Sequence, residues 1–187
     1  MATNWIPLQS VPRAGSVLRL DDQTIWAGPI QEFGMVCRIV EPLHAEVSIL
    51  PQEDGVLFRG KISGKVALPC DRCSEESVVA VRHSFDGFEP LPAFDAQDSD
   101  SDAESAEVDE TVIRLAPHGG GVEVNPAALV WEEFSLALPV NILCRDDCKG
   151  LCPVCGNNRN NDPCACAREE GDPRLSALRG LTVSKKK

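Results

Sequence analysis

The chain has 187 residues, of which 43% are hydrophobic, so it can hold one domain of good size, or one domain with a small appendage. Aromatic residues make up 5% of the chain and tyrosine is absent, which argues against a surface that reads bases by stacking. The net charge of −11 counts against a nucleic-acid partner, but eight of the acids lie in residues 95–110, which contain no basic residue, so the rest of the chain excludes RNA less strongly.

The N-terminal sequence MATNWIPLQSVPRAG has neither a basic flank nor a continuous apolar run, so we expect no signal peptide. No stretch approaches the roughly 20 apolar residues of a membrane helix. Both observations predict a cytoplasmic protein. Because thiols stay reduced in the cytoplasm, the nine cysteines indicate metal ligands before disulfides.

Three runs of alternating apolar and polar residues predict strands in the first half of the chain. They are residues 43–50, 56–68 and 77–88, and Asp54-Gly55 suits the hairpin loop between the first two. Together they predict an antiparallel meander with one buried face. The segment around residues 25–29 is broken by turn residues and is assigned to no element.

Residues 92–110 are acidic, rich in Ser and Asp, and nearly free of large apolar side chains. Such a segment buries too little surface to offset its ordering entropy, so we predict a disordered loop.

A helix is predicted to begin at Asn125-Pro126, with Asn125 as the cap and Pro126 in the first turn. Apolar residues at three- and four-residue spacing extend it to about Phe134. A short extended segment over residues 136–140 follows, and a second short helix is expected over 173–181.

These elements predict an α+β fold in which an antiparallel, β-dominated domain with one or two short helices precedes a cysteine-rich metal-binding segment. The predicted boundaries are 1–143 for the β-rich domain, and 144–187 for the cysteine-rich segment with its short C-terminal helix.

The sequence Cys152-Pro-Val-Cys155-Gly is the strongest functional signal. Two thiolates at this spacing can hold one tetrahedral ion from a single tight turn, and glycine permits the backbone conformation that turns amides toward sulfur. A second pair, Cys164 and Cys166, follows after a polar loop. Four thiolates in two short pairs predict a structural zinc site, with an iron–sulfur cluster as the chemical rival.

Four other cysteines compete for this role or form a second site. Cys144 and Cys148 directly precede the first set, while Cys70 and Cys73 form another C-x-x-C at the end of a predicted strand. Cys70 and Cys73 allow three interpretations: a redox pair, half of a second metal site completed by Cys144 and Cys148, or packed thiols with Arg72 in a salt bridge. A second site would leave only Cys37 unused.

Catalytic machinery is not visible in the sequence. The three histidines are scattered, and the acids Glu132-Glu133 on a helix usually face solvent. The run Gly119–Gly121 lacks the frame of a phosphate-binding loop. We therefore expect a protein that is not an enzyme.

Several motifs, taken in order, resemble one family. They are Cys70-x-Arg72-Cys73, Glu133-Phe-Ser-Leu-Ala-Leu-Pro139, Cys148-Lys-Gly-Leu-Cys-Pro-Val-Cys-Gly156 with Asn160, Cys164 and Cys166 behind it, and Asp172-Pro-Arg-Leu-Ser-Ala-Leu178. On these residues the chain is similar to the YceD family, bacterial and plastid proteins named for accumulation of large-subunit ribosomal RNA. Small departures are Val122–Asn125, where many members have Ile-Asp-Leu, and Arg159, where leucine is usual.

The resemblance implies a mixed, β-dominated fold and a non-enzymatic role in large-subunit accumulation and ribosome assembly. The implied partner is large-subunit ribosomal RNA or a large-subunit ribosomal protein. Because the C-terminal end is mildly basic, Lys149, Arg159 and Arg168 are the candidate RNA contacts. The alternative is a thiol-based redox or metal-transfer protein that uses Cys70 and Cys73.

Overall fold

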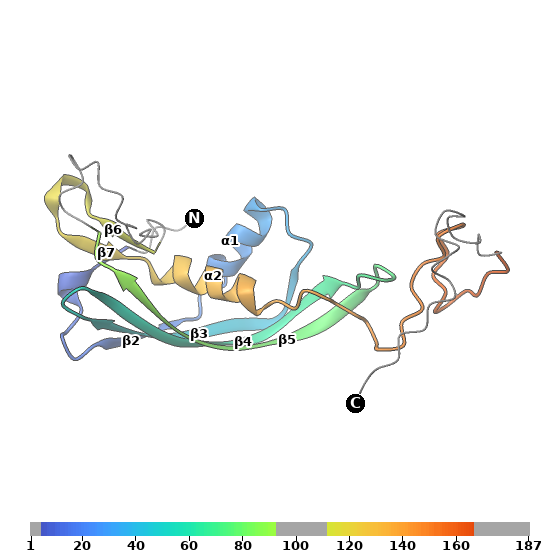
Figure 1. Cartoon of the computed structure of the whole chain (residues 1–187), viewed down its shortest axis with the longest axis horizontal. Helices are drawn as coiled ribbons and strands as arrows, with labels where there is room; N and C mark the ends of the chain where they lie inside the picture. The colour runs from blue at the N-terminus through green and yellow to red at the C-terminus, as the bar shows by residue number, and fades with distance from the viewer. Residues whose placement is uncertain (1–4, 93–111, 167–187) are drawn as a thin grey trace, which may run out of the picture.

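The computed structural model describes residues 5–92 and 112–166. Its centre is a four-stranded antiparallel sheet in the order β2-β3-β4-β5, long and curved, with two helices along one face (Figure 1). The strands are β2 Ser16–Leu20, β3 Arg38–Pro51, β4 Gly55–Pro69 and β5 Glu76–Pro90. The predicted fold class and the three predicted strands are confirmed.

Alternating side chains give this sheet one buried face. On β3 the buried side chains are two residues apart, from Leu43 to Ile49, and Phe58 and Ile62 continue the row on β4. On β5 the matching positions are Val81 and Phe85. Burial of this apolar face against the helices is the main stabilising term, at about 25 cal/mol per Å² removed from water.

The strand β3 begins five residues before the predicted start. The prediction began late because a bulge interrupts the alternation in the first part of the strand. The register with β4 shifts between Ile39 and Glu41 and again between Glu41 and His44. At the bulge the Gln23 side chain replaces a neighbouring strand, donating to the Leu43 carbonyl at 2.8 Å and accepting from its amide at 3.0 Å. An extra residue breaks the two-residue alternation, so sequence periodicity misses the first part of the strand.

The segment around residues 25–29, assigned to no element from sequence, is the helix α1 Thr24–Glu32. Pro29 lies inside it, which is why Gly28-Pro29 resembled a turn. Trp26 is completely buried and contacts Phe134 edge to face, with ring centroids 5.4 Å apart. Burial of large apolar side chains on one side therefore outweighs the poor helix propensity of the segment.

The predicted helix at Asn125 is α2 Pro126–Ala137, and its cap is confirmed: the Asn125 side chain accepts from the Ala128 amide at 3.3 Å. The helix ends at Ala137 rather than Phe134. Leu136 and Ala137 are therefore helical, and the predicted extended segment begins only at Leu138.

A second, small sheet covers one end of the molecule, away from the cysteines (Figure 1). It has the order β1-β7-β6, from β1 Ile6–Pro7, β7 Val122–Val124 and β6 Ile113–Leu115. Short helical turns, η1 Leu8–Ser10 and η2 Pro117–Gly119, adjoin it. Strands of two or three residues are too short to produce a readable periodicity, and the sequence did not predict them.

Two predicted features lie outside the described residues: nearly all of the acidic loop at 92–110, and the short helix at 173–181. Within the described ranges, no helix has the length and apolar character needed to cross a membrane.

Candidate metal centres

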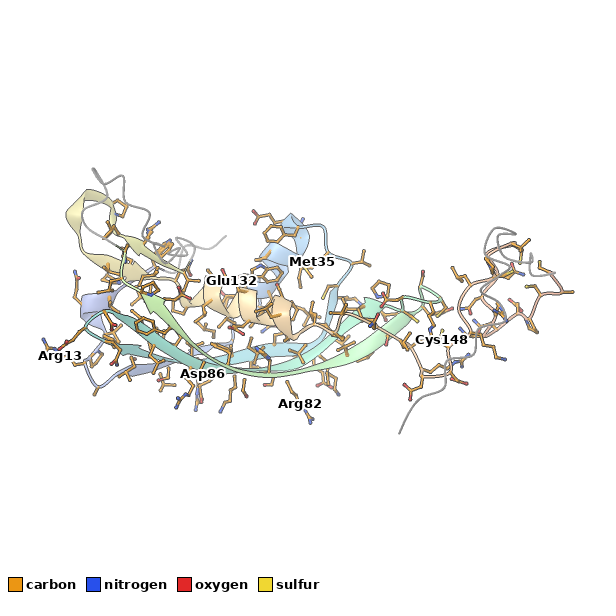
Figure 2. All side chains as sticks on the ribbon, in the orientation of Figure 1. Arg13, Met35, Arg82, Asp86, Glu132 and Cys148 are labelled. Atoms are coloured by element: carbon orange, nitrogen blue, oxygen red, sulfur yellow. The ribbon has the colours of Figure 1, made fainter. Side chains whose placement is uncertain are left out.

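The β4–β5 hairpin and the segment after α2 bring four cysteines together. Cys70 and Cys73 lie in the hairpin turn, and Cys144 and Cys148 come from the later segment. Their four sulfurs lie within 4.8 Å of one another. Cys148 lies just beyond the far end of the hairpin (Figure 2). We call this group the first tetrad.

The hairpin turn is shaped so that both of its thiols face the same point. The Ser74 amide donates to the Cys70 carbonyl, and the Cys70 amide donates to the Glu75 carbonyl, each at 2.8 Å. Ser74 has a φ of 60°, a left-handed conformation that non-glycine residues adopt at a cost. Two backbone hydrogen bonds and one left-handed residue therefore fix the turn between the two 15-residue strands.

The segment after α2 is bound to the hairpin turn by hydrogen bonds at the two residues just before Cys144. Asp71 and Ile142 are joined twice: the Asp71 amide donates to the Ile142 carbonyl at 2.8 Å, and the Ile142 amide donates to Asp71 Oδ2 at 2.6 Å. The Ser77 hydroxyl donates to the Leu143 carbonyl at 3.0 Å. Cys144 is therefore positioned by backbone pairing.

Cys148 is positioned through Arg72. Arg72 Nη1 donates to the Cys148 carbonyl at 2.9 Å, and the Leu151 amide donates to the Arg72 carbonyl at 2.9 Å. Gly150 between them has a φ of 69°, and a Cβ there would lie 2.9 Å from the Arg72 carbonyl oxygen. The salt bridge considered for Arg72 is replaced by this hydrogen bond to the backbone.

The sulfur spacing of the first tetrad matches one tetrahedral ion. The Cys70 and Cys148 sulfurs are 3.8 Å apart, and the Cys73 and Cys144 sulfurs are 3.6 Å apart. Metal–sulfur bonds of about 2.3 Å give a tetrahedron whose sulfur–sulfur edges are about 3.8 Å. A disulfide would bring two sulfurs to about 2.05 Å. The donor set and its geometry therefore fit a single ion bound by four cysteines.

Backbone amides favour the thiolate form at two positions of the first tetrad. Burial opposes ionisation of Cys70, but hydrogen bonds from the Arg72, Cys144 and Cys73 amides outweigh it and lower the pKa to about 6. The pKa of Cys148 is also lowered, because the Asn160 side chain and the Gly150 amide outweigh burial. Four thiolates this close repel one another, and burial and the neighbouring sulfurs raise the pKa of Cys144 to about 12. A bound cation would compensate that charge.

The four cysteines with the strongest sequence signal form a second tetrad. The Cys152, Cys155, Cys164 and Cys166 sulfurs also lie within 4.8 Å of one another. The Gly156 amide donates to the Cys152 carbonyl at 2.9 Å, and Gly156 has the left-handed φ of 75° that the sequence motif requires. Hydrogen bonds from the Cys155 and Val154 amides lower the pKa of Cys152 to about 6.

Burial separates the two tetrads. In the first, Cys70, Cys73 and Cys148 are 1%, 4% and 3% exposed. In the second, Cys152 is buried, but Cys155 and Cys166 are exposed. Cys144 of the first tetrad is also exposed, so three of four thiols are buried in the first tetrad and one of four in the second.

Asn160 connects the two tetrads. Its Nδ2 donates to Cys148 Sγ at 3.3 Å, and its Oδ1 accepts from the Lys149 amide at 2.8 Å. Asn158 supports it, accepting at 2.9 Å from Asn160 Nδ2 and donating at 3.0 Å to Glu75. Residue types alone gave no role to these asparagines; their spacing behind a cysteine motif was the available signal.

The remaining predicted residues are not among the eight tetrad cysteines. Lys149 directly follows Cys148, and its amide donates to Asn160 Oδ1; Arg159 lies in the loop between Cys155 and Cys164, and its amide donates to the Gly150 carbonyl. Arg168 lies outside the described residues. Cys37 is half-buried and packs against the main core. The predicted domain boundary at 143/144 stays a prediction, and the first tetrad takes two cysteines from each side of it.

Two histidines make structural contacts. His83 Nε2 lies 2.7 Å from Glu133 Oε2, which connects β5 to α2. His44 Nδ1 lies 2.8 Å from Asp21 Oδ1 at the surface. Neither pair faces a cysteine tetrad.

Comparison with known proteins assigns a family to these motifs. The family model described as "Large ribosomal RNA subunit accumulation protein YceD" matches residues 58–182. The Arabidopsis thaliana protein named "Large ribosomal RNA subunit accumulation protein YCED homolog 1, chloroplastic" is 24% identical over 157 residues, covering 75% of this chain and 48% of that protein. An uncharacterized protein of Mycobacterium tuberculosis is 26% identical over 137 residues, covering 73% of this chain and 60% of that protein. The chain thus spans about half of one relative and 60% of the other. No solved structure matches.

Proposed function

Because this chain belongs to the YceD family, whose model spans all eight cysteines of the two tetrads, we propose that it supports the accumulation of large-subunit ribosomal RNA as a non-enzymatic assembly factor. The family match is the observation that carries the proposal. The proposed partner is large-subunit ribosomal RNA or a large-subunit ribosomal protein, and the proposed location is the cytoplasm.

We further propose that each tetrad binds one structural zinc ion. Sites with four thiolates and no open position are typical of structural zinc. Cys70, Cys73, Cys144 and Cys148 hold the first ion, and the second tetrad holds the other. An iron–sulfur cluster divides four thiolates among two or more irons, so its sulfurs spread wider than the edges of one tetrahedron. Sulfurs within 4.8 Å of one another favour one ion in each tetrad.

The alternative of a thiol enzyme using Cys70 and Cys73 is less consistent with the geometry. The lowered pKa of Cys70 would suit a nucleophile, but reactive cysteines are partly exposed, whereas these two thiols are 1% and 4% exposed. Two further sulfurs also share their site. The same amides that lower the pKa would stabilise a metal-bound thiolate, so we favour the metal site.

Ribosomal RNA in cells lacking the gene tests the proposed function. We expect the ratio of large- to small-subunit ribosomal RNA to fall, and the wild-type chain to restore it. A Cys70→Ser/Cys73→Ser variant should not restore the ratio, while Cys37→Ser, which alters a cysteine outside both tetrads, should. An unchanged ratio in the deletion strain would remove the proposal.

Elemental analysis separately tests the metal assignment. Purified protein should contain two zinc ions per chain and no stoichiometric iron. Iron together with acid-labile sulfide would instead assign an iron–sulfur cluster to the cysteines. A folded, metal-free protein would contradict both the zinc and the iron–sulfur assignment.

A further inference from the structure

The two faces of the large sheet differ in charge. The face under the helices is covered by α1 and α2, which together contain no Lys or Arg and three glutamates, Glu32, Glu132 and Glu133. The opposite, outer face carries most of the basic side chains of β2 to β5. Figure 2 shows Arg82 and Asp86 pointing away from the helices on this outer face, with Glu132 on the helical side.

Strand register places the basic side chains of the outer face close together. Arg59, Lys61 and Lys65 point outward from the central strand β4, spaced by two or four residues. Alternate residues of a strand are about 7 Å apart, so the three form one row. Arg19 on β2 lies opposite Glu46, the register partner of Lys61, and Arg82 on β5 lies opposite Ser63. The result is a patch whose basic side chains come from β2, β4 and β5, while β3 contributes Glu41 and Glu46 to the same face.

Three adjacent hollows run across this patch. Their volumes are about 430, 230 and 450 Å³. Small side chains, Ser48, Ser63 and Ser84, lie among the long charged side chains that line them. Serine hydroxyls can donate hydrogen bonds to phosphate oxygens, as arginine and lysine can. The patch therefore offers neutral and charged donors beside three local hollows on the convex outer face of the curved sheet (Figure 1).

The cations of the patch are unequally paired. Lys61 and Arg19 share Glu46 at 3.0 and 3.5 Å, and Lys65 pairs with Glu41 at 2.6 Å. Within the described part of the chain, Arg59 and Arg82 have no hydrogen-bond or ion-pair partner. Asp86 is the register partner of Arg59, without an ion pair between them. Two arginines are thus available to an external anion.

The metal-bearing end of the molecule has the opposite balance. The hairpin turn 70–76 and the segment 141–166 contain four basic side chains and six acidic ones. Arg145 is already paired with Asp147 at 3.5 Å. A divalent ion bound by four thiolates would leave two further negative charges at each tetrad. Within the described residues, Lys149 and Arg159 therefore lie in more acidic surroundings than Arg59 and Arg82.

We propose that the outer face of the sheet, centred on Arg59 and Arg82, binds the phosphate backbone of large-subunit ribosomal RNA. The proposal rests on the proposed function and moves the RNA contact away from Lys149 and Arg159. Apart from Phe88 near the end of β5, the outward positions of the described strands carry no Phe, Tyr or Trp. The face therefore contacts phosphates rather than stacking on bases.

Two double variants with equal loss of charge test this surface. Arg59→Gln/Arg82→Gln removes the unpaired arginines, and Lys149→Gln/Arg159→Gln removes two cations beside the tetrads. The probe is an in vitro transcript of large-subunit ribosomal RNA, and its affinity for the zinc-loaded protein is measured over a range of salt concentrations. We expect the first variant to bind about tenfold more weakly and its salt slope to fall by roughly 1.5, from two phosphate contacts. The second should stay near wild type.

The controls separate folding, charge and function. Both arginines are exposed, so the melting temperature of the first variant should be unchanged, and Arg59→Lys/Arg82→Lys should recover most of the binding. Normal RNA binding by the first variant, or loss of binding confined to the second, overturns the proposal. So does normal RNA binding with loss of a co-purified ribosomal protein, which would make the face a protein contact. If any of these results is found while the wild-type gene still restores ribosomal RNA levels in the deletion strain, the proposed function stands and only the surface assignment fails.

Discussion

The two cysteine tetrads have the same four ligands but different relations to the fold. The first joins residues 71 apart in sequence, Cys73 and Cys144, and buries three of its four thiols where the segment after α2 meets the tip of the β4–β5 hairpin. The second lies entirely within residues 152–166 and leaves Cys155 and Cys166 exposed. A cross-link that closes a long loop removes more conformational entropy from the unfolded chain than a cross-link that closes a short loop. We therefore expect the first tetrad to stabilise the whole molecule and the second only its own loop.

The largest effect should come from Cys73→Ser. This change removes a buried ligand and leaves three close thiols without the charge compensation of a full site. Loss of a structural metal site belongs to the mutations that cost about 4 kcal/mol or more, so thermal unfolding of the sheet should shift strongly downward. Differential scanning calorimetry of the zinc-loaded protein measures it. A shift no larger than that of the matched Cys155→Ser variant would mean that the two tetrads are equivalent.

A pair of glycine variants should give the next largest effect. Gly150 and Gly156 both have left-handed φ values, 69° and 75°, so alanine imposes a similar backbone strain of roughly 1–2 kcal/mol at either site. Only Gly150 is crowded: its Cβ would lie 2.9 Å from the Arg72 carbonyl oxygen, whereas nothing lies within 4 Å at Gly156. We expect Gly150→Ala to lower the free energy of unfolding by about 3 kcal/mol in total, because the Arg72 carbonyl, which accepts a hydrogen bond from the Leu151 amide, must also move.

Chemical denaturation of both glycine variants checks this difference. Gly156→Ala is the matched control, since it carries the backbone strain without the collision. Equal losses at the two positions would show that the contact between Gly150 and Arg72 does not couple the loop to the sheet.

Cys155→Ser should have a smaller effect on global stability, under about 1 kcal/mol, although it removes one of the proposed metal ligands. The second tetrad contacts the sheet through few groups, so its loss should unfold mainly residues 152–166. We expect bound zinc to fall from two ions to one, with the sheet melting almost unchanged. Hydrogen exchange should show protection lost in the loop and kept in β4 and β5. Loss of protection throughout the sheet would contradict the expectation that the second tetrad stabilises only its own loop.

How far the sequence could predict these tetrads depended on chain separation. The metal-site motif of Cys152 and Cys155 could be predicted from sequence because both cysteines and the following glycine lie within one turn. The pairing of Cys70 and Cys73 with Cys144 and Cys148 remained one of three interpretations, because only the fold returns the chain after α2 to the tip of the β4–β5 hairpin. Local spacing carries no information about that return.

Elements of the fold could likewise be predicted where the signal was local and were missed where it depended on distant residues. Strands β4 and β5 were predicted because approximate alternation of apolar and polar residues continues over more than ten residues. The helix α1 was missed because Gly28-Pro29 indicates a turn locally, whereas burial of Trp26 against Phe134 is a tertiary effect that overrides propensity. The start of β3 was missed because Gln23, distant in sequence, satisfies the bulge.

The smallest effect is expected from Cys37→Ser. Cys37 packs against the main core, and burial raises the pKa of its thiol, whereas hydrogen bonds lower the pKa of Cys70, Cys148 and Cys152 in the tetrads. Exchange of a half-buried thiol for a hydroxyl loses little apolar contact and should cost less than about 1 kcal/mol. Zinc content should stay at two ions per chain, measured by elemental analysis beside Cys73→Ser as the positive control. Release of zinc from Cys37→Ser would place this ninth cysteine in a tetrad and break the division into two sets of four on which the comparison depends.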